Sequence, residues 1–175
     1  MGACAVFLDR DGVLVETFVR DNRAFAATTL DDFRLVENAA AEVERLRDAG
    51  LVPIVVTNQP DVARGLIAPA TLAAMHERLA AEVPVLDIFV CTHDSSAGCA
   101  CRKPKPGMLE ATAAKWNIDL QRSFMVGDRT SDVEAGRAAG CRTILIERPY
   151  SGAAVPDARV DTLADAVGVI LGWSV

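Results

Sequence analysis

Short apolar segments alternate with longer amphipathic stretches along most of this chain. The apolar segments are bounded by polar residues, which is typical of short strands buried in a sheet. They cover residues 3–8, 51–56, 86–90, 123–126 and 142–146. The amphipathic stretches predict helices that bury one face. They cover residues 39–49, 70–82, 107–116, 131–139 and 162–171.

Strands that alternate with helices usually form a parallel sheet with helical crossovers. The predicted fold class is therefore α/β, with a doubly wound, mostly parallel sheet. No repeat or low-complexity linker divides the chain, so we expect residues 1–175 to form a single domain. In such sheets ligands bind at the carboxyl ends of the strands. Residues 12–36 lack a regular period and are expected to cross over that site, and residues 92–106 need something to order them.

The overall charge restricts the possible partners. The chain has 175 residues and a formal net charge of -6. This balance disfavours a general nucleic-acid or anionic-membrane binder, because such proteins are usually basic. No apolar run approaches the ~18 residues that a membrane span needs, and no secretory signal precedes the first predicted strand. We therefore expect a cytoplasmic monomer that binds neither nucleic acid nor a membrane.

Soft metal ligands are concentrated in one loop. Three of the five cysteines and one of the two histidines lie within residues 91–101. They are Cys91, His93, Cys99 and Cys101. In the cytoplasm such clusters bind metal more often than they form disulfides. A Cys₃His set suits tetrahedral zinc and leaves no open position, so it predicts a structural zinc loop. Cys4 and Cys141 lie on predicted strands and are interpreted as buried apolar residues.

Acidic side chains follow the first and fourth predicted strands. Asp9 and Asp11 come directly after the first, where Gly12 lets the chain bend, and Asp128 follows the fourth. Paired carboxylates suit Mg²⁺, and one can act as a nucleophile while another donates a proton. Alone, an Asp-x-Asp-Gly motif also occurs in turns and calcium loops. Asp132 is compatible either with helix N-terminal electrostatics or with a contact to the metal site.

Neutral and basic groups follow the remaining strand ends. Thr57 ends the second strand, where its hydroxyl can bond a phosphoryl oxygen; a polar loop with a helix cap is the alternative. Arg102 and Lys103 directly follow the cysteine cluster. Arg suits bidentate phosphate recognition, and Lys acts as a point charge. A run of charges is usually a solvated face, but only three lysines occur in the chain and two follow this cluster. The pattern favours a phosphate site.

The order of these groups resembles the haloacid dehalogenase superfamily of phosphatases. The matching positions are Asp9, Asp11 and Gly12 for the first motif, Thr57 for the second, Lys103 for the third, and Gly127, Asp128 and Asp132 for the fourth. The match spans nearly the whole chain and implies a Rossmann-like fold without a large cap domain. The zinc loop narrows the resemblance to a small capless branch that contains heptose bisphosphate and histidinol-phosphate phosphatases.

This resemblance implies a role for each matched residue. Asp9 would be the nucleophile that forms an aspartyl-phosphate, and Asp11 the general acid and base. Thr57 and Lys103 would stabilise the transferring oxygens. The ligands of Mg²⁺ would be Asp9, Asp128 and the backbone carbonyl of Asp11, and the substrate-binding residues would be Asn58, Gln59, Arg102 and Arg129.

The implied substrate is a small phosphorylated metabolite. The residues around Thr57 and Lys103 are more similar to the heptose enzymes, which remove the 7-phosphate of D-glycero-D-manno-heptose 1,7-bisphosphate in heptose or lipopolysaccharide biosynthesis. The five residues between His93 and Cys99 are similar to the histidinol-phosphate branch, so histidinol phosphate or another small sugar phosphate is the alternative. The non-enzyme alternative is a receiver-type signalling domain, whose phosphorylated Asp should follow a central strand rather than the first one.

Overall fold

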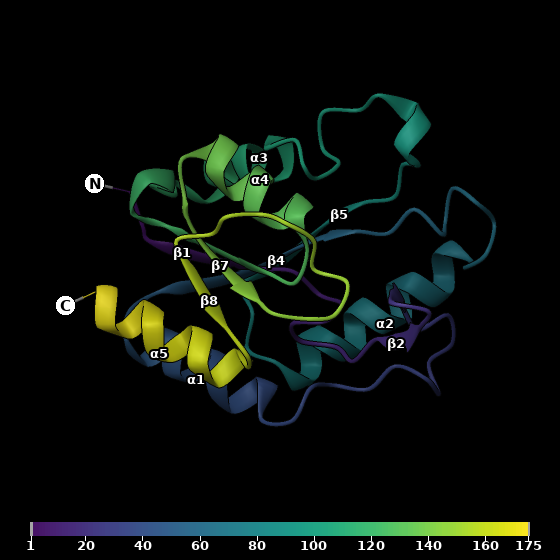
Figure 1. The fold of residues 1–175 in the computed structure, drawn as a ribbon, viewed down its shortest axis with the longest axis horizontal. Helices are drawn as coiled ribbons and strands as arrows, with labels where there is room; N and C mark the ends of the chain where they lie inside the picture. Colours follow the sequence, from purple (N-terminus) through teal and green to yellow (C-terminus); the bar gives the residue numbers. More distant parts are fainter. Residues whose placement is uncertain (1, 175) are drawn as a thin grey trace.

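The computed structural model describes residues 2–174 and contains a six-stranded parallel sheet with helices on both faces (Figure 1). The strands lie in the order β5-β4-β1-β6-β7-β8. Their bounds are Ala5–Leu8 for β1, Val52–Asn58 for β4, Asp87–Cys91 for β5, Phe124–Gly127 for β6, Arg142–Ile146 for β7 and Ala158–Val160 for β8. The predicted α/β fold with a doubly wound, mostly parallel sheet is confirmed.

Four helices connect these strands and a fifth follows β8, and each was predicted to within two residues at either end. They are α1 (Ala39–Asp48), α2 (Pro69–Glu82), α3 (Gly107–Trp116), α4 (Thr130–Ala139) and α5 (Leu163–Trp173), with short 3₁₀ turns η1 (Ser95–Ala97) and η2 (Leu120–Arg122). Gly140 ends α4 in the left-handed conformation, with φ of 87°, as expected for a helix C-cap. None of the helices within residues 2–174 has the length and hydrophobicity needed to cross a membrane.

Strand β1 supplies both hydrophobic layers. Val6 and Leu8 join one cluster with side chains of α1, α2 and α5, while Ala5 and Phe7 join a second cluster with α3 and α4. Figure 1 shows α1 and α5 side by side on one face of the sheet and α3 with α4 on the other. Because successive residues of a strand point to opposite faces, a strand covered on both sides is apolar at every position.

The position of β1 changes one argument made from the sequence. β1 lies between β4 and β6, so the first strand of the chain is a central strand of the sheet. The expectation that strand position excludes a receiver domain is therefore wrong, because chain order does not give the place of a strand in a doubly wound sheet. Strands β1, β4, β5 and β6 run side by side in parallel, so their carboxyl ends meet at one edge.

The irregular segment 12–36 contains a hairpin that periodicity did not predict. Its strands are β2 (Phe18–Arg20) and β3 (Arg23–Phe25), joined by Asp21 and Asn22. Both turn residues have positive φ, 48° and 55°, as two-residue hairpin turns of this kind require. The base of the segment is buried around Val15 and paired with Leu35, so the hairpin projects from an anchored stem.

Candidate active site

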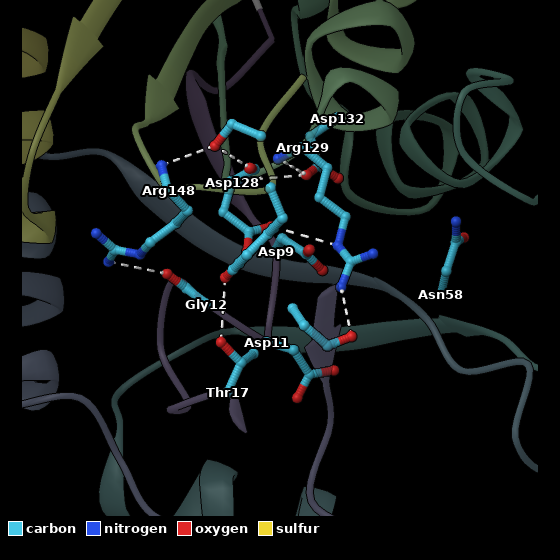
Figure 2. Close-up of polar contacts among 12 residues, drawn as sticks. Asp9, Asp11, Gly12, Thr17, Asn58, Asp128, Arg129, Asp132 and Arg148 are labelled. Carbon is cyan, nitrogen blue, oxygen red and sulfur yellow. Dashed lines mark hydrogen bonds and ion pairs between the residues drawn. The ribbon is translucent and has the colours of Figure 1, made fainter. Parts of the chain in front are cut away.

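Three buried carboxylates meet beyond the carboxyl ends of β1 and β6 (Figure 2). Asp9 follows β1, Asp128 follows β6, and Asp132 lies in the first turn of α4. One oxygen atom from each carboxylate lies within 4.8 Å of the other two. Of the predicted magnesium ligands, the structure thus brings the side chains of Asp9 and Asp128 together, and it adds Asp132 to them.

A glycine makes room for the Asp128 carboxylate. Gly12 has φ of 82°, and a Cβ atom there would lie 2.0 Å from Oδ2 of Asp128. Any other residue would therefore combine a strained backbone with a clash. Oδ2 accepts a hydrogen bond from the hydroxyl of Tyr150 at 2.7 Å, whereas the buried Oδ1 accepts none from the residues that the structure describes. A buried carboxylate oxygen without a donor is suited to bind a cation.

The electrostatics of the three carboxylates also favour a bound cation. Burial raises the pKa of the Asp128 carboxyl to about 8, and the neighbouring Asp9 and Asp132 carboxylates add to the rise. Both causes act against the charged form, since the low-dielectric surroundings and the like charges each disfavour a further anion. A divalent cation next to Asp9 and Asp128 would reverse both effects. The donor set and its charge therefore fit a hard cation such as Mg²⁺.

The Lys103 ammonium group lies between two of the three carboxylates. Its Nζ atom is 3.0 Å from Oδ1 of Asp9 and 2.6 Å from Oδ1 of Asp132. It also donates a hydrogen bond to the Val56 carbonyl at 2.8 Å. Burial alone would lower the pKa of Lys103, but the charges of Asp132 and Asp9 outweigh it and raise the pKa above its usual value. Lys103 is therefore held as a buried cation.

Asp132 uses both of its oxygen atoms within the protein. Oδ1 faces Lys103, and Oδ2 accepts hydrogen bonds from the backbone N–H groups of Asp128 at 3.2 Å and Arg129 at 3.0 Å. These bonds fix the loop between β6 and α4. Gly127 allows the approach, because a Cβ atom there would lie 2.1 Å from Cβ of Asp132. Of the two interpretations left open by the sequence, the geometry favours a helix N-terminal anchor that also orients Lys103.

Asp11 lies apart from the three carboxylates (Figure 2). Its oxygen atoms accept hydrogen bonds from the Arg10 guanidinium at 3.0 to 3.1 Å and from Nε2 of Gln59 at 2.6 Å. The same Nε2 atom donates to Oγ1 of Thr57 at 2.9 Å. Gln59 was predicted to bind substrate. Its amide nitrogen instead donates hydrogen bonds to two predicted catalytic residues, Asp11 and Thr57.

Two residues behind Asp11 were missed by the sequence analysis. Arg10 is fully buried, and its Nη1 atom is 3.2 Å from Nε2 of His76. Burial lowers the pKa of His76 to about 4, and the Arg10 charge contributes to the shift. A neutral His76 can accept the hydrogen bond from Arg10 at neutral pH. The guanidinium also lies 5.5 Å from the centre of the Phe33 ring. The contacts with His76 and Phe33 thus fix the Arg10 guanidinium, which in turn holds Asp11.

Asn58 joins the end of β4 to the segment that carries Lys103. Its Nδ2 atom donates to the Lys103 carbonyl at 3.0 Å, and its Oδ1 atom accepts from the Lys103 N–H at 3.1 Å. Asn58 was predicted to bind substrate, but the structure places both ends of its amide on the protein backbone. Its observed contacts therefore position Lys103.

The four predicted zinc ligands form a second cluster at the end of β5. Sγ of Cys91 lies 3.7 Å from Sγ of Cys99 and 3.0 Å from Sγ of Cys101. Nδ1 of His93 lies 3.5 Å from Sγ of Cys91 and 3.3 Å from Sγ of Cys101. Ligands about 2.3 Å from a common zinc ion in a tetrahedron are roughly 3.8 Å apart. The observed separations of 3.0 to 3.7 Å are somewhat shorter, and all five cysteines are free thiols, so the cluster has the donor set of a zinc site.

Basic side chains bind the backbone of this loop. Nζ of Lys105 donates to the carbonyls of Gly98 at 2.9 Å and Cys99 at 2.8 Å. Nη1 of Arg102 donates to the His93 carbonyl at 3.2 Å. Arg102 was predicted to bind substrate, and the other donors of its guanidinium leave that capacity open.

The turn after β7 also contributes to the site, and the sequence analysis did not identify it. Tyr150 reaches Asp128, as described above, and the Arg129 guanidinium lies 5.4 Å from the centre of the Tyr150 ring. Arg129, a predicted substrate-binding residue, also donates to the Ala24 carbonyl at 3.4 Å. The only sequence signal for this turn was its position. Residues 147–152 follow a strand, and ligands bind at the edge of the sheet where the strands end.

Comparison with known proteins gives a consistent set of relatives. A HAD-hydrolase-like family model matches residues 100–166. The chain is 40% identical over 147 residues, 81% of each chain, to the D-glycero-beta-D-manno-heptose-1,7-bisphosphate 7-phosphatase of Pseudomonas putida. It is 34% identical, over 77% of its length and 76% of the relative, to the D-glycero-alpha-D-manno-heptose-1,7-bisphosphate 7-phosphatase of Photorhabdus laumondii.

A solved structure resembles this chain along nearly its whole length. It is the D,D-heptose 1,7-bisphosphate phosphatase of B. bronchiseptica in complex with magnesium and phosphate. The TM-score is 0.84 at 31% sequence identity, with 97% of this chain and 99% of that chain covered. The similarity therefore includes the sheet, the segment 12–36 and the cysteine loop.

Replacing Lys103 with methionine is expected to lower the free energy of unfolding by about 3–5 kcal/mol at pH 7, because it leaves two buried carboxylates without their cation. The loss should shrink as the pH falls, because burial raises the pKa of the Asp132 carboxyl, which can then take up a proton. Chemical denaturation measures the loss at each pH. The control is Lys115→Met, which removes an exposed ion pair with Asp87 and should cost at most about 1 kcal/mol. Equal losses in the two variants would contradict the buried cation described here.

Proposed function

The chain belongs to the haloacid dehalogenase-like phosphatases, and from this membership we propose that it removes the 7-phosphate of D-glycero-D-manno-heptose 1,7-bisphosphate. The observation that carries the proposal is the grouping of Asp9, Asp128 and Lys103 at the carboxyl edge of the sheet. The two carboxylates can hold a metal ion, and the Lys103 ammonium can hold a phosphoryl group beside that ion.

In this proposal Asp9 is the nucleophile. Its Oδ1 atom accepts hydrogen bonds from Lys103 and from the backbone N–H of Arg10 at 2.8 Å, which fixes the carboxylate. The other oxygen attacks phosphorus, the bond from phosphorus to the sugar oxygen breaks, and an aspartyl-phosphate forms. Water then attacks this intermediate and releases phosphate, which returns Asp9 to its starting state.

Asp11 acts as the general acid and then as the general base. It gives a proton to the leaving sugar oxygen and later takes one from the attacking water. Arg10 and Gln59 hold Asp11 beside the site. Thr57 accepts the hydrogen bond from Gln59, so its own hydroxyl proton is free for a phosphoryl oxygen.

Asp9 and Asp128 would hold Mg²⁺, with the backbone carbonyl of Asp11 as a third protein ligand. The buried Oδ1 atom of Asp128, which has no hydrogen-bond donor among the described residues, supports this assignment. The cation, when bound, offsets the repulsion between an anionic nucleophile and an anionic phosphate. Lys103 would add a second positive charge beside Asp9, where Asp132 holds it.

The Cys₃His cluster would bind a structural zinc ion. The spacing of the four ligand atoms and the completeness of the set support a closed tetrahedral site. Zinc would order residues 91–101, which have little regular structure beyond η1. Since Lys103 directly follows this loop, an ordered loop also fixes the backbone that Asn58 binds.

The heptose substrate is proposed from the names of the relatives, which include phosphatases of both anomers. A bisphosphate carries a second anionic group, and Arg102 and Arg129 are the cations proposed to contact the remainder of the substrate. Histidinol phosphate is the second candidate, because the five residues between His93 and Cys99 are similar to that branch.

A side-by-side rate comparison tests the substrate. We expect the alpha or beta anomer of heptose 1,7-bisphosphate to give the highest kcat/KM, because Arg102 and Arg129 would supply positive charge for a second phosphate. The other compounds are histidinol phosphate and an aryl phosphate, and every assay is run with and without Mg²⁺. A higher kcat/KM for histidinol phosphate would replace the proposed substrate while leaving the phosphatase chemistry in place.

Asp9→Asn is expected to abolish phosphate release while the protein stays folded, because the amide is a poor nucleophile but still accepts the hydrogen bonds on Oδ1. Phosphate release and circular dichroism measure the two properties. Asp48→Asn, on the exposed side of α1, serves as the matched control and should keep full activity. Turnover near the wild-type rate in Asp9→Asn would rule out Asp9 as the nucleophile.

Freshly purified protein is expected to contain about one zinc ion per chain, and to keep it after mild chelation that removes Mg²⁺, because four protein ligands enclose it. Metal analysis by mass spectrometry measures the content. Cys99→Ser should lose zinc, whereas Cys4→Ser, outside the cluster, should retain it. Protein that is folded and free of zinc would refute the assignment.

A further inference from the structure

Tyr150 contacts the carboxylate that the proposed cation needs. Its hydroxyl lies 2.7 Å from Oδ2 of Asp128, and this is the oxygen that does not face the cation in the arrangement proposed above. The opposite oxygen, Oδ1, is buried and accepts no hydrogen bond from the described residues. A donor on one oxygen restricts rotation of the carboxylate, and so determines where the other oxygen points. Partners of this kind typically change metal affinity by about 10- to 100-fold.

The turn that carries Tyr150 is attached to the same loop as Asp128. The buried hydroxyl of Ser151 donates to the Asp128 carbonyl at 2.7 Å and accepts from the Arg148 N–H at 2.8 Å. The Ser151 carbonyl accepts from the N–H of Thr130 at 2.9 Å. Asp128 is thus held twice by this turn, at its backbone by Ser151 and at its side chain by Tyr150. The tyrosine hydroxyl therefore has a defined position.

Tyr150 also contacts the segment that crosses the site. Its oxygen lies 3.1 Å from Oγ1 of Thr17, just before β2 (Figure 2 labels Thr17). When Asp128 is ionised, as a cation ligand must be, the Tyr150 proton points to Asp128. Thr17 must then donate to the Tyr150 oxygen, because a phenol has only one proton. The hydrogen bonds therefore run in one direction, from Thr17 to Tyr150 to Asp128.

A second contact supports the same connection. The Arg129 guanidinium lies over the Tyr150 ring, and it donates to the carbonyl of Ala24 in β3. Arg148, from the same turn as Tyr150, donates to the Gly12 carbonyl at 3.4 Å. The turn at residues 148–151 and the residue after Asp128 thus contact the segment 12–36 at three places: Gly12, Thr17 and Ala24.

We propose that Tyr150 is a positioning residue that orients Asp128 toward the cation and, through Thr17, couples cation binding to the docking of the β2–β3 hairpin over the site. The inference rests on the proposed magnesium site and goes beyond it, because it concerns a residue outside the four family motifs. Coupling of this kind is reciprocal, so a docked hairpin favours the cation as much as the cation favours the docked hairpin.

The first test is the Mg²⁺ affinity of Tyr150→Phe, measured by calorimetry without substrate. Phenylalanine keeps the ring beneath Arg129 and removes only the hydroxyl. We expect an affinity about 10-fold weaker than that of the wild type, with an unchanged unfolding midpoint in the absence of Mg²⁺. An affinity equal to that of the wild type would overturn the proposal, as would an affinity loss matched by general unfolding of the metal-free protein.

A double-mutant cycle tests the coupling to the hairpin. Thr17→Val removes the donor to Tyr150 and is expected to weaken Mg²⁺ binding by about threefold, whereas Thr17→Ser keeps a hydroxyl and should restore the wild-type affinity. The double variant with Tyr150→Phe should bind no more weakly than Tyr150→Phe alone, because both changes break one chain of bonds. Additive losses would show that Thr17 acts independently, and would refute the coupling.

A spectroscopic measurement separates this inference from the proposed function. Tyr150 is the only tyrosine in the chain, so protein with ¹³C-labelled tyrosine gives ring signals from this residue alone. In the wild type these signals should shift with Mg²⁺ at the same midpoint as the calorimetric titration, and in Thr17→Val at a higher concentration. Signals that do not respond would refute contact with the cation site. If they respond and heptose bisphosphate is not hydrolysed, the substrate proposal fails and the role of Tyr150 stands.

Discussion

The buried ammonium group of Lys103 is the constraint on which the rest of the site depends. It interacts with Asp9 after β1, with Asp132 in α4 and with the carbonyl of Val56 in β4. A cation with almost no access to solvent is stable only while its anionic partners are in place. Lys103 therefore holds the end of β1, the start of α4 and strand β4 close together. The spacing of the Asp9 and Asp132 carboxylates depends on this contact.

Much of the fold could be predicted because buried parallel strands and amphipathic helices leave strong local patterns. The five helices and five of the strands correspond to such patterns. β2, β3 and β8 have three residues each, too few to show a period, and the hairpin turn uses Asp21 and Asn22 instead of the usual glycine. The place of β1 in the centre of the sheet could not be predicted from chain order.

The grouping of side chains was predictable where each residue lies at or near the end of a strand, as with Asp9, Asp128 and the four Cys and His residues of the loop. It was less predictable where a residue acts through another one. Asn58 has the chemistry of a substrate ligand but binds the backbone of Lys103, and Arg10, which holds Asp11, was not identified from the sequence. Such roles depend on contacts between positions far apart in the chain, which spacing does not encode.

The central place of β1 also affects how the protein must be made. β1 is fully buried, and it pairs with β4 on one side and with β6, more than a hundred residues later, on the other. During translation one edge of this apolar strand has no partner until β6 has been synthesised. Unpaired apolar edges promote aggregation, and such distant contacts form slowly. The strand that begins the active site is thus also a part of the nascent chain that needs protection until β6 has been made.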